Sequence, residues 1–310
     1  MKQKQAEISK GAGTPDDANA PGARALGDYE IHQAWEGFAS IRQISSGEIM
    51  HSRTAPLEEA RRIYVEQAHL AQRLRDQDAA GELVLWDVGL GAGANAMAAI
   101  ACCEEVAATG IAAALCIISF ENDLDSLRLA ARHPEQFPYL AHEAPAALLE
   151  HGHWRSKSVP NLTWTLIPGD FVERMSDAQS APDLVFYDMF SSRTSGRLWA
   201  FPTFRRLFEI CGAKDVELFT YTCSTANRAA LLAAGFFVAR GRNAGPKIET
   251  TIALTPLAAS HPKRAQRDFL SRDWLAKWDR STAKFPPDVG ASDRPQFEKS
   301  IREHKQFRNS

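Results

Sequence analysis

The chain has 310 residues, of which 45% are apolar, and a formal net charge of −2 at pH 7. This composition suits one large globular domain with extensions, and the near-neutral charge neither requires nor rules out a nucleic-acid partner. The five cysteines include no Cys-x-x-Cys pair, which argues against a disulfide framework or a zinc site and for a reducing compartment.

The N-terminal segment, residues 1–27, is polar, with scattered Gly, Pro and Ala, and lacks the apolar run of a signal peptide. We interpret it as a flexible arm. No apolar run in the chain approaches the roughly 20 residues that a membrane span needs. The sequence therefore predicts a cytoplasmic protein with no membrane partner.

The next segment, residues 28–80, is predicted to form a strand and helix extension. Residues 28–50 alternate weakly and contain glycine turns, a pattern that predicts two or three short antiparallel strands. A helix is expected over 56–75, because Pro56 suits the first helical position and the two glutamates that follow suit the first turn.

Residues 81–256 alternate between buried strands and helices, which predicts a mostly parallel sheet covered on both faces. The strands are expected at 83–88, 113–120, 162–167, 183–188, 216–222, 236–241 and 250–256. The segment between the last two is too short for a helical crossover, so this pair should be antiparallel. The expected fold is a doubly wound α/β sheet of seven strands, Rossmann-like and of the class I methyltransferase type.

Two further segments have no place in this alternation. Residues 134–160 are an insertion rich in Pro and His. The tail, residues 257–310, holds 12 Lys or Arg against 7 Asp or Glu, with Trp274 and Trp278 four residues apart on an expected helix. The tail is either an RNA-contacting arm or a helical tail whose tryptophans pack on the core, and the second reading is slightly favoured.

The first chemical motif is DVGLGAG, with Asp87, Gly89, Gly91 and Gly93 between a strand and a helix. Glycines at these positions let the backbone approach a ligand closely. A GxGxxA dinucleotide reading exists, but Asp87 would repel a pyrophosphate. It favours S-adenosylmethionine instead, which carries a sulfonium and an ammonium and no phosphate. Asn95, at the start of the next helix, is assigned to the same ligand.

Acidic residues follow the next three parallel strands, where the ligand crevice of an open α/β sheet lies. Glu121 can accept both ribose hydroxyls, or it is a surface cap for the next helix. Asp170 can accept the adenine amino group, cap a helix, or do both. Asp188 would sit beside the methyl donor and orient an amine or accept its proton, or cap a loop. Phe190 can stack on a substrate ring or belong to the core.

At this point the residues resemble a family. The segments HSRTAPLEEA, DVGLGAGANA, SFEND, GDF, YDMF and TYTCSTANRAALLAAGF are similar to those of the MnmC-type methyltransferases. These resemble the methyltransferase half of the bifunctional enzyme that completes 5-methylaminomethyl-2-thiouridine at the tRNA wobble position. The resemblance covers roughly residues 28–256.

The resemblance implies roles for particular residues. The three glycines would cradle the methionine part of S-adenosylmethionine, Glu121 would bind ribose and Asp170 adenine. Asp188 would face the substrate amine. The segment beginning at Ser52 would close over the cofactor, and Lys247 would lie near the substrate mouth. The loop DMFSSRTSGRLW departs from the family, which commonly has DGF and prolines there.

The resemblance also implies partners and leaves alternatives open. The expected partner is tRNA, with a separate flavin enzyme upstream, because the residues after Pro256 are too few for a flavin oxidase half. The alternatives are a methyltransferase acting on a small molecule or a protein, a nicotinamide-dependent oxidoreductase, and an inactive cofactor-binding module. No metal site is expected, since His151 and His153 lack an obvious third ligand.

Overall fold

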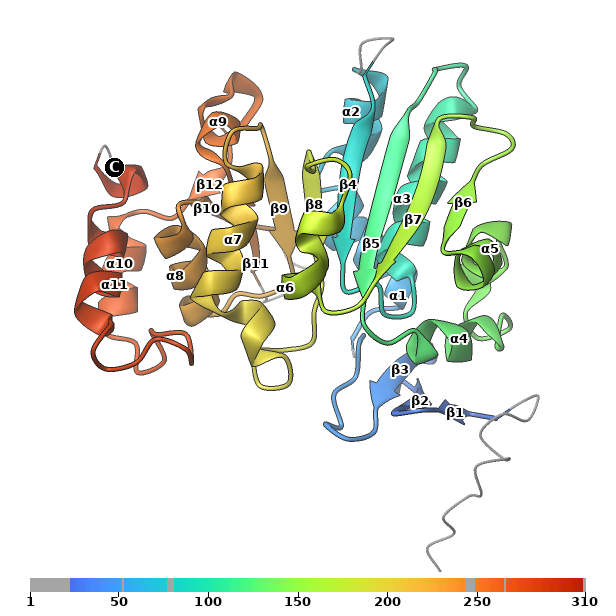
Figure 1. The fold of residues 1–310 in the computed structure, drawn as a ribbon, viewed down its shortest axis with the longest axis horizontal. Helices are drawn as coiled ribbons and strands as arrows, with labels where there is room; N and C mark the ends of the chain where they lie inside the picture. Colours follow the sequence, from blue (N-terminus) through green and yellow to red (C-terminus); the bar gives the residue numbers. More distant parts are fainter. Residues whose placement is uncertain (1–22, 52, 77–80, 243–248, 265, 309–310) are drawn as a thin grey trace, which may run out of the picture.

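The computed structural model describes residues 23–51, 53–76, 81–242, 249–264 and 266–308. Its centre is one twisted sheet with helices on both faces (Figure 1). In the described residues the strand order is β12 (Asp268–Phe269), β10 (Phe237–Gly241), β11 (Thr250–Leu254), β9 (Glu217–Thr220), β8 (Leu184–Tyr187), β4 (Leu83–Val88), β5 (Leu115–Glu121), β7 (Leu162–Pro168) and β6 (His153–Arg155). The five strands from β9 to β7 are parallel, and the others are antiparallel to their neighbours.

The seven expected strands and the antiparallel closing pair are confirmed. The described sheet has nine strands rather than seven, because short strands extend it at both edges. One of them, β6, lies in the insertion, which also forms a 3-10 turn over Pro138–Leu140 and helix α5 (Glu143–His151). The other, β12, belongs to the tail and pairs with β10. The insertion therefore widens the sheet instead of forming a separate unit.

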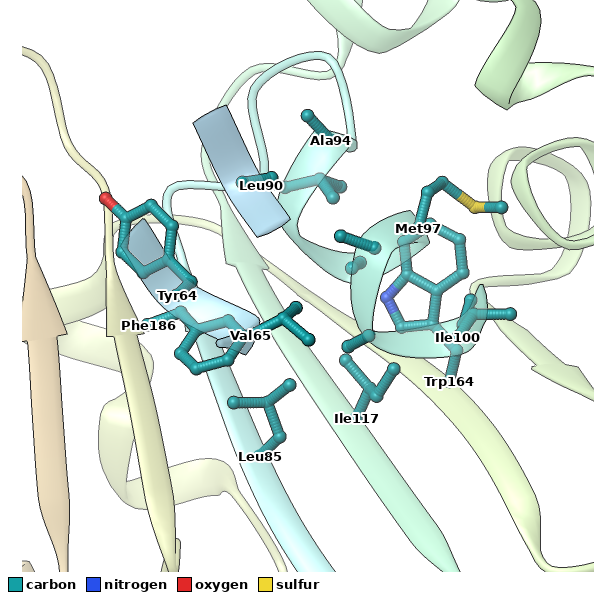
Figure 2. Packing of buried hydrophobic residues seen from close by; sticks show 14 of the residues in the cluster. Tyr64, Val65, Leu85, Leu90, Ala94, Met97, Ile100, Ile117, Trp164 and Phe186 are labelled. Carbon is teal, nitrogen blue, oxygen red and sulfur yellow. The ribbon is translucent and has the colours of Figure 1, made fainter. Parts of the chain in front are cut away.

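The helices divide the core into two layers. The remaining helices are α1 (Pro56–Ala60), α2 (Leu70–Arg75), α3 (Ala94–Ala107), α4 (Asp125–Ala131), α6 (Phe171–Arg174), α7 (Phe201–Cys211), α8 (Thr225–Ala234), α9 (Pro256–Ser260), α10 (Arg272–Asp279) and α11 (Arg294–Arg302), with short 3-10 turns at Met175–Asp177, Gly196–Trp199, Pro262–Arg264 and Lys305–Phe307. Side chains of β4 alternate between the layers: Leu85 packs with α3, and Trp86 packs with α6 and α7. Figure 2 shows the first layer.

The helix expected over 56–75 begins at Pro56 as predicted but is not continuous. A π-helical turn, Arg61–Val65, follows α1, and His69 adopts a left-handed backbone conformation with φ of 51° before α2 begins. A non-glycine residue in this conformation interrupts helical hydrogen bonding. The turn places the Tyr64 ring beside Phe186, with 5.2 Å between ring centroids (Figure 2).

The small N-terminal sheet and the C-terminal helices α10 and α11 lie apart in the fold (Figure 1). A small antiparallel sheet of β1 (Ala25–Leu26), β2 (Tyr29–Gln33) and β3 (Ala39–Gln43) packs near α4, below the carboxyl ends of β4 and β5. Ala25 and Leu26 fall in the stretch assigned to the arm, but they pair with β2. None of the described helices is long and apolar enough to cross a membrane.

Candidate functional site

A large cavity of about 1900 Å³ opens at the carboxyl ends of β4, β5 and β8. Its floor is the glycine loop and the segments after β5 and β8, and its cover comes from the β2–β3 hairpin, the segment after β3 and α1. The cavity thus lies in the crevice where open α/β sheets bind ligands. Within the described residues, no group of three His, Cys, Asp or Glu side chains could hold a metal ion.

The glycine loop needs its glycines for two different reasons. Gly89 has a φ of 89°, and a Cβ there would lie 2.7 Å from the backbone oxygen of Asp188. Gly91 has a φ of 51°, and Gly93 has a φ of 80° where it precedes α3. L side chains rarely adopt these angles. Gly89 and Gly91 both line the cavity, so a ligand can approach bare backbone there.

Glu121 ends β5 and lies against the glycine loop. One carboxylate oxygen accepts hydrogen bonds from the backbone N–H groups of Asn122 and Asp123, at 2.8 and 3.1 Å, and the other accepts one from Gly91 at 3.0 Å. Burial raises the pKa of Glu121, although these three bonds oppose the shift. The second oxygen keeps a lone pair, and Glu121 lines the cavity. This arrangement fits a ligand with ribose hydroxyls.

Asp87 lies beneath the glycine loop and does not line the cavity. It is fully buried; one carboxyl oxygen accepts a hydrogen bond from Ser119 Oγ at 2.7 Å, and the other has no partner among the described residues. Burial raises its pKa to about 7. Asp87 can therefore act on a ligand in the cavity only electrostatically, through the loop, and its assignment to the cofactor stays a prediction.

Asp188 follows β8, is half-buried, and is the centre of a polar cluster that faces the cavity. Its Oδ2 accepts a hydrogen bond of 2.8 Å from the Asn95 amide. Burial raises the pKa of Asp188, while the nearby imidazole of His51 and the Asn95 bond oppose the shift. Asn95 therefore holds the candidate catalytic carboxylate instead of only serving a cofactor, and its own Oδ1 has no partner among the described residues.

Three further members of this cluster come from the N-terminal extension. His51 is buried, and its Nδ1 lies 3.4 Å from Glu59 Oε1. Burial lowers the pKa of His51, but Glu59 and Asp188 act in the opposite direction and leave it raised. The Tyr64 side chain is buried, and burial together with the charge of Asp188 raises the pKa of its hydroxyl.

Sequence reasoning missed these three residues. The segment HSRTAPLEEA contributed to the family resemblance, but no chemistry was assigned to His51, and the glutamates were read as helix-start residues. Only tertiary packing brings them to Asp188. The available signal was a histidine followed by a carboxylate eight positions later in a segment expected to cover the ligand.

The other expected site residues lie in different surroundings. Asp170 caps α6, accepting a hydrogen bond of 2.7 Å from the Val172 N–H, and pairs with Arg197; it does not line the cavity. The capping role is confirmed, and adenine binding stays a prediction. Phe190 lines the cavity and also packs against the core. Ser52 and Lys247 lie outside the described residues.

The cover of the cavity is tied to the loop after β8. Glu48, in the segment after β3, accepts hydrogen bonds from the backbone N–H and the hydroxyl of Ser191, at 2.7 and 2.9 Å, and from the Thr194 hydroxyl. These charge-assisted bonds join the cover to the segment that carries Asp188. The N-terminal extension and the loop after β8, which differs from the family pattern, therefore shape the substrate mouth together.

Comparisons with known proteins agree with this geometry. Residues 139–256 match a family model described as S-adenosyl-L-methionine-dependent methyltransferase. The chain is similar to tRNA 5-methylaminomethyl-2-thiouridine biosynthesis bifunctional proteins MnmC. That of Ectopseudomonas mendocina is 27% identical over 69% of this chain, and that of Pseudomonas syringae pv. syringae is 25% identical over 78%. These matches span 33% and 36% of the relatives, so the chain spans about a third of their length.

A solved structure supports the fold. The crystal structure of MNMC2 from Aquifex aeolicus superposes with a TM-score of 0.64 and 21% identity, over 88% of this chain and 83% of that one. The similarity extends beyond the central sheet, since the match includes most of the chain.

Proposed function

We propose that this S-adenosylmethionine-dependent methyltransferase is of the MnmC type and methylates the nitrogen of an aminomethyl group on the wobble uridine of tRNA. The observation that best supports an amine substrate is the polar cluster around Asp188 at the cavity floor. The similarity to proteins that are named for this tRNA modification supports the RNA substrate. A separate enzyme would supply the aminomethyl group.

Different residues around the cavity would bind the cofactor and position the amine. The backbone of Gly89 and Gly91 and the carboxylate of Glu121 would hold S-adenosylmethionine. Asp87, whose pKa is about 7, would add negative potential beneath the loop in its ionised form. When bound, S-adenosylmethionine supplies a methyl group on a positively charged sulfur that a nitrogen lone pair can displace. The protein's task is to hold that nitrogen close and in line.

Asp188 prepares the amine. An alkylamine is protonated at pH 7, so it enters as an ammonium and must lose one proton before its lone pair can react. Asp188 attracts the ammonium and accepts that proton, which its raised pKa favours. Asn95 fixes the direction of the carboxylate. The proton leaves to solvent after each turnover.

The test is transfer of labelled methyl from S-adenosylmethionine to tRNA carrying aminomethyluridine, with unmodified tRNA as the control. Wild-type protein should label only the first. Asp188→Asn should keep its affinity for S-adenosylhomocysteine and lose turnover on the order of 10²-fold or more. Labelling of a small amine or a protein and neither tRNA would overturn the tRNA assignment, and full turnover by Asp188→Asn would remove its role as base.

His51 gives a second measurement on the same site. A protonated imidazole lowers the pKa of Asp188, so His51→Asn should raise that pKa and move the rising limb of the kcat–pH profile to higher pH. Glu59, Tyr64 and Tyr221 are the other titratable groups that act on this cluster. A His51→Asn profile that coincides with the wild-type profile would show that His51 is only a packing residue.

A further inference from the structure

The β2–β3 hairpin carries a fully exposed tryptophan at the edge of the cavity. Trp35 has a relative exposure of 100%, whereas the other six tryptophans of the chain, Trp86, Trp154, Trp164, Trp199, Trp274 and Trp278, are at most 6% exposed. An exposed indole offers an apolar ring face on which another ring can stack. Trp35 therefore stands apart from every other tryptophan in the molecule.

The tip of the hairpin holds Trp35 in a defined place. The backbone N–H of Ala34 donates to Phe38 O at 2.8 Å, and that of Gly37 donates to Ala34 O at 3.0 Å. Gly37 has a φ of 91°, which closes the turn. The three residues after Trp35 all line the cavity. The indole is thus presented on a closed turn beside the cavity mouth.

Two unpaired cations line the same cavity. Arg53 and Arg193 are exposed and have no ion pair or hydrogen bond among the described residues, whereas Arg62, which also lines the cavity, pairs with Glu58. Guanidinium groups of this kind can bind phosphate oxygens. Glu36, next to Trp35, is a carboxylate that can accept a hydrogen bond from the amino group of a base.

We propose that Trp35, Arg53 and Arg193 form a docking surface for a single-stranded RNA loop, with a nucleobase stacked on the Trp35 indole and phosphates on the two arginines. Aromatic stacking with cations along the backbone is how proteins hold unpaired nucleotides. The surface rests on the proposed function, because it would hold the nucleotides that flank the target. A duplex has no free base to offer Trp35, so the surface selects a loop.

The experiment measures binding of a synthetic RNA hairpin with a single-stranded loop, with a fully paired duplex of similar length as the control. Iodide quenching of intrinsic fluorescence reports on Trp35, because the other six tryptophans are buried. The hairpin should protect Trp35 from iodide, and the duplex should not. Trp35→Ala should weaken hairpin binding about tenfold, while Trp35→Phe keeps a ring and most of the affinity.

Controls separate stacking from charge and from general apolar exposure. Leu257→Ala removes an exposed apolar side chain outside the cavity and should leave hairpin binding unchanged. Replacing Arg53 and Arg193 by Gln should reduce the slope of log affinity against log salt by about 0.7 per cation. Equal protection of Trp35 by hairpin and duplex would overturn the proposal. So would protection that rises with protein concentration alone, which would identify a second copy of the chain as the occupant.

The outcome is separable from that of the proposed function. If tRNA is methylated and Trp35→Ala leaves its KM unchanged, the docking surface fails and the reaction stands. If the hairpin protects Trp35 but no tRNA accepts a methyl group, the reaction assignment fails and the surface stands.

Discussion

The cavity region and the C-terminal region of this molecule differ in whether their buried polar atoms have hydrogen-bond partners. Near the cavity, Asp87 Oδ1 and Asn95 Oδ1 are buried without hydrogen-bond partners in the described residues, and His51 Nδ1 has only the 3.4 Å ion-pair contact with Glu59. In the described part of 256–308, no buried side-chain polar atom is left in this state. Buried unpaired groups cost stability, and proteins keep them mainly where a ligand or reaction uses them.

The C-terminal region contributes packing instead. The rings of Trp274 and Trp278 stack with 6.4 Å between centroids, and Phe297, Ile301 and Phe307 complete a buried apolar cluster with α8. The tail, whose basic composition suggested RNA, therefore buries its tryptophans. The N-terminal extension, which showed no such charge bias, supplies His51 and Glu59 to the cavity. The basic extension thus serves packing, and the extension without a basic bias supplies residues to the cavity.

The largest effect is expected at a fully buried tryptophan of the C-terminal region. Trp278 is fully buried, and its Nε1 donates to Lys284 O at 3.0 Å. Trp278→Ala should lower the free energy of unfolding by about 3–5 kcal/mol, measured by urea denaturation. Methyl transfer per folded molecule should stay at the wild-type level. A loss of turnover in the folded variant would contradict the view that the C-terminal region contributes to stability alone.

The next effect concerns Asp87 and pH. Its pKa is about 7 in the folded protein against an ordinary value of 3.8, so the folded state binds the proton more tightly. The protonated Asp87 therefore contributes to the stability of the folded state at low pH, and this stabilisation is lost as pH rises through 7. In the Asp87→Asn variant, this fall in the free energy of unfolding, as much as about 4 kcal/mol, should be absent. The variant should also bind S-adenosylhomocysteine more weakly. Equal pH dependence of unfolding in both proteins would show that Asp87 is not the responsible group.

A smaller effect is expected at Glu121. Glu121→Ala removes the proposed ribose acceptor and should weaken S-adenosylhomocysteine binding by about 1.5–3 kcal/mol, measured by isothermal titration. Three backbone N–H groups also lose their acceptor, so the ligand-free melting temperature should fall modestly. Unchanged affinity per folded molecule with lower stability would make Glu121 purely structural.

The sequence predicted what depends on local pattern. Strands such as Leu83–Val88 were located because continuous apolar runs mark buried parallel strands. Glu121 and Asp188 were assigned to a site because the carboxyl ends of parallel strands meet at one edge. The edge strands β6 and β12, three and two residues long, are too short to show alternation.

Other features depend on contacts between distant segments. His51 and Tyr64 meet Asp188 only because α1 and the turn after it pack over the sheet, and no periodicity in 28–80 shows this. Asp170 is a different case: its position after a strand suggested a ligand, and its side chain caps a helix and accepts a hydrogen bond from Arg197. Strand position indicates where an acid lies, and only tertiary structure shows where it points.

The smallest effect is expected at the cations of the tail, where composition alone suggested RNA. Lys277, Arg280 and Lys299 are exposed on or beside α10 and α11, without ion pairs in the described residues. They lie outside the cavity, and α11, which carries Lys299, packs against α8. Replacing all three by Gln should change RNA-hairpin affinity less than about twofold and leave its salt slope unchanged, because they would neutralise no phosphate of a loop bound at the cavity mouth. The double change at Arg53 and Arg193, which removes fewer charges, is the matched comparison. A slope that falls for the tail variant and not for the rim variant would place the RNA on the tail and reverse the roles of the two regions.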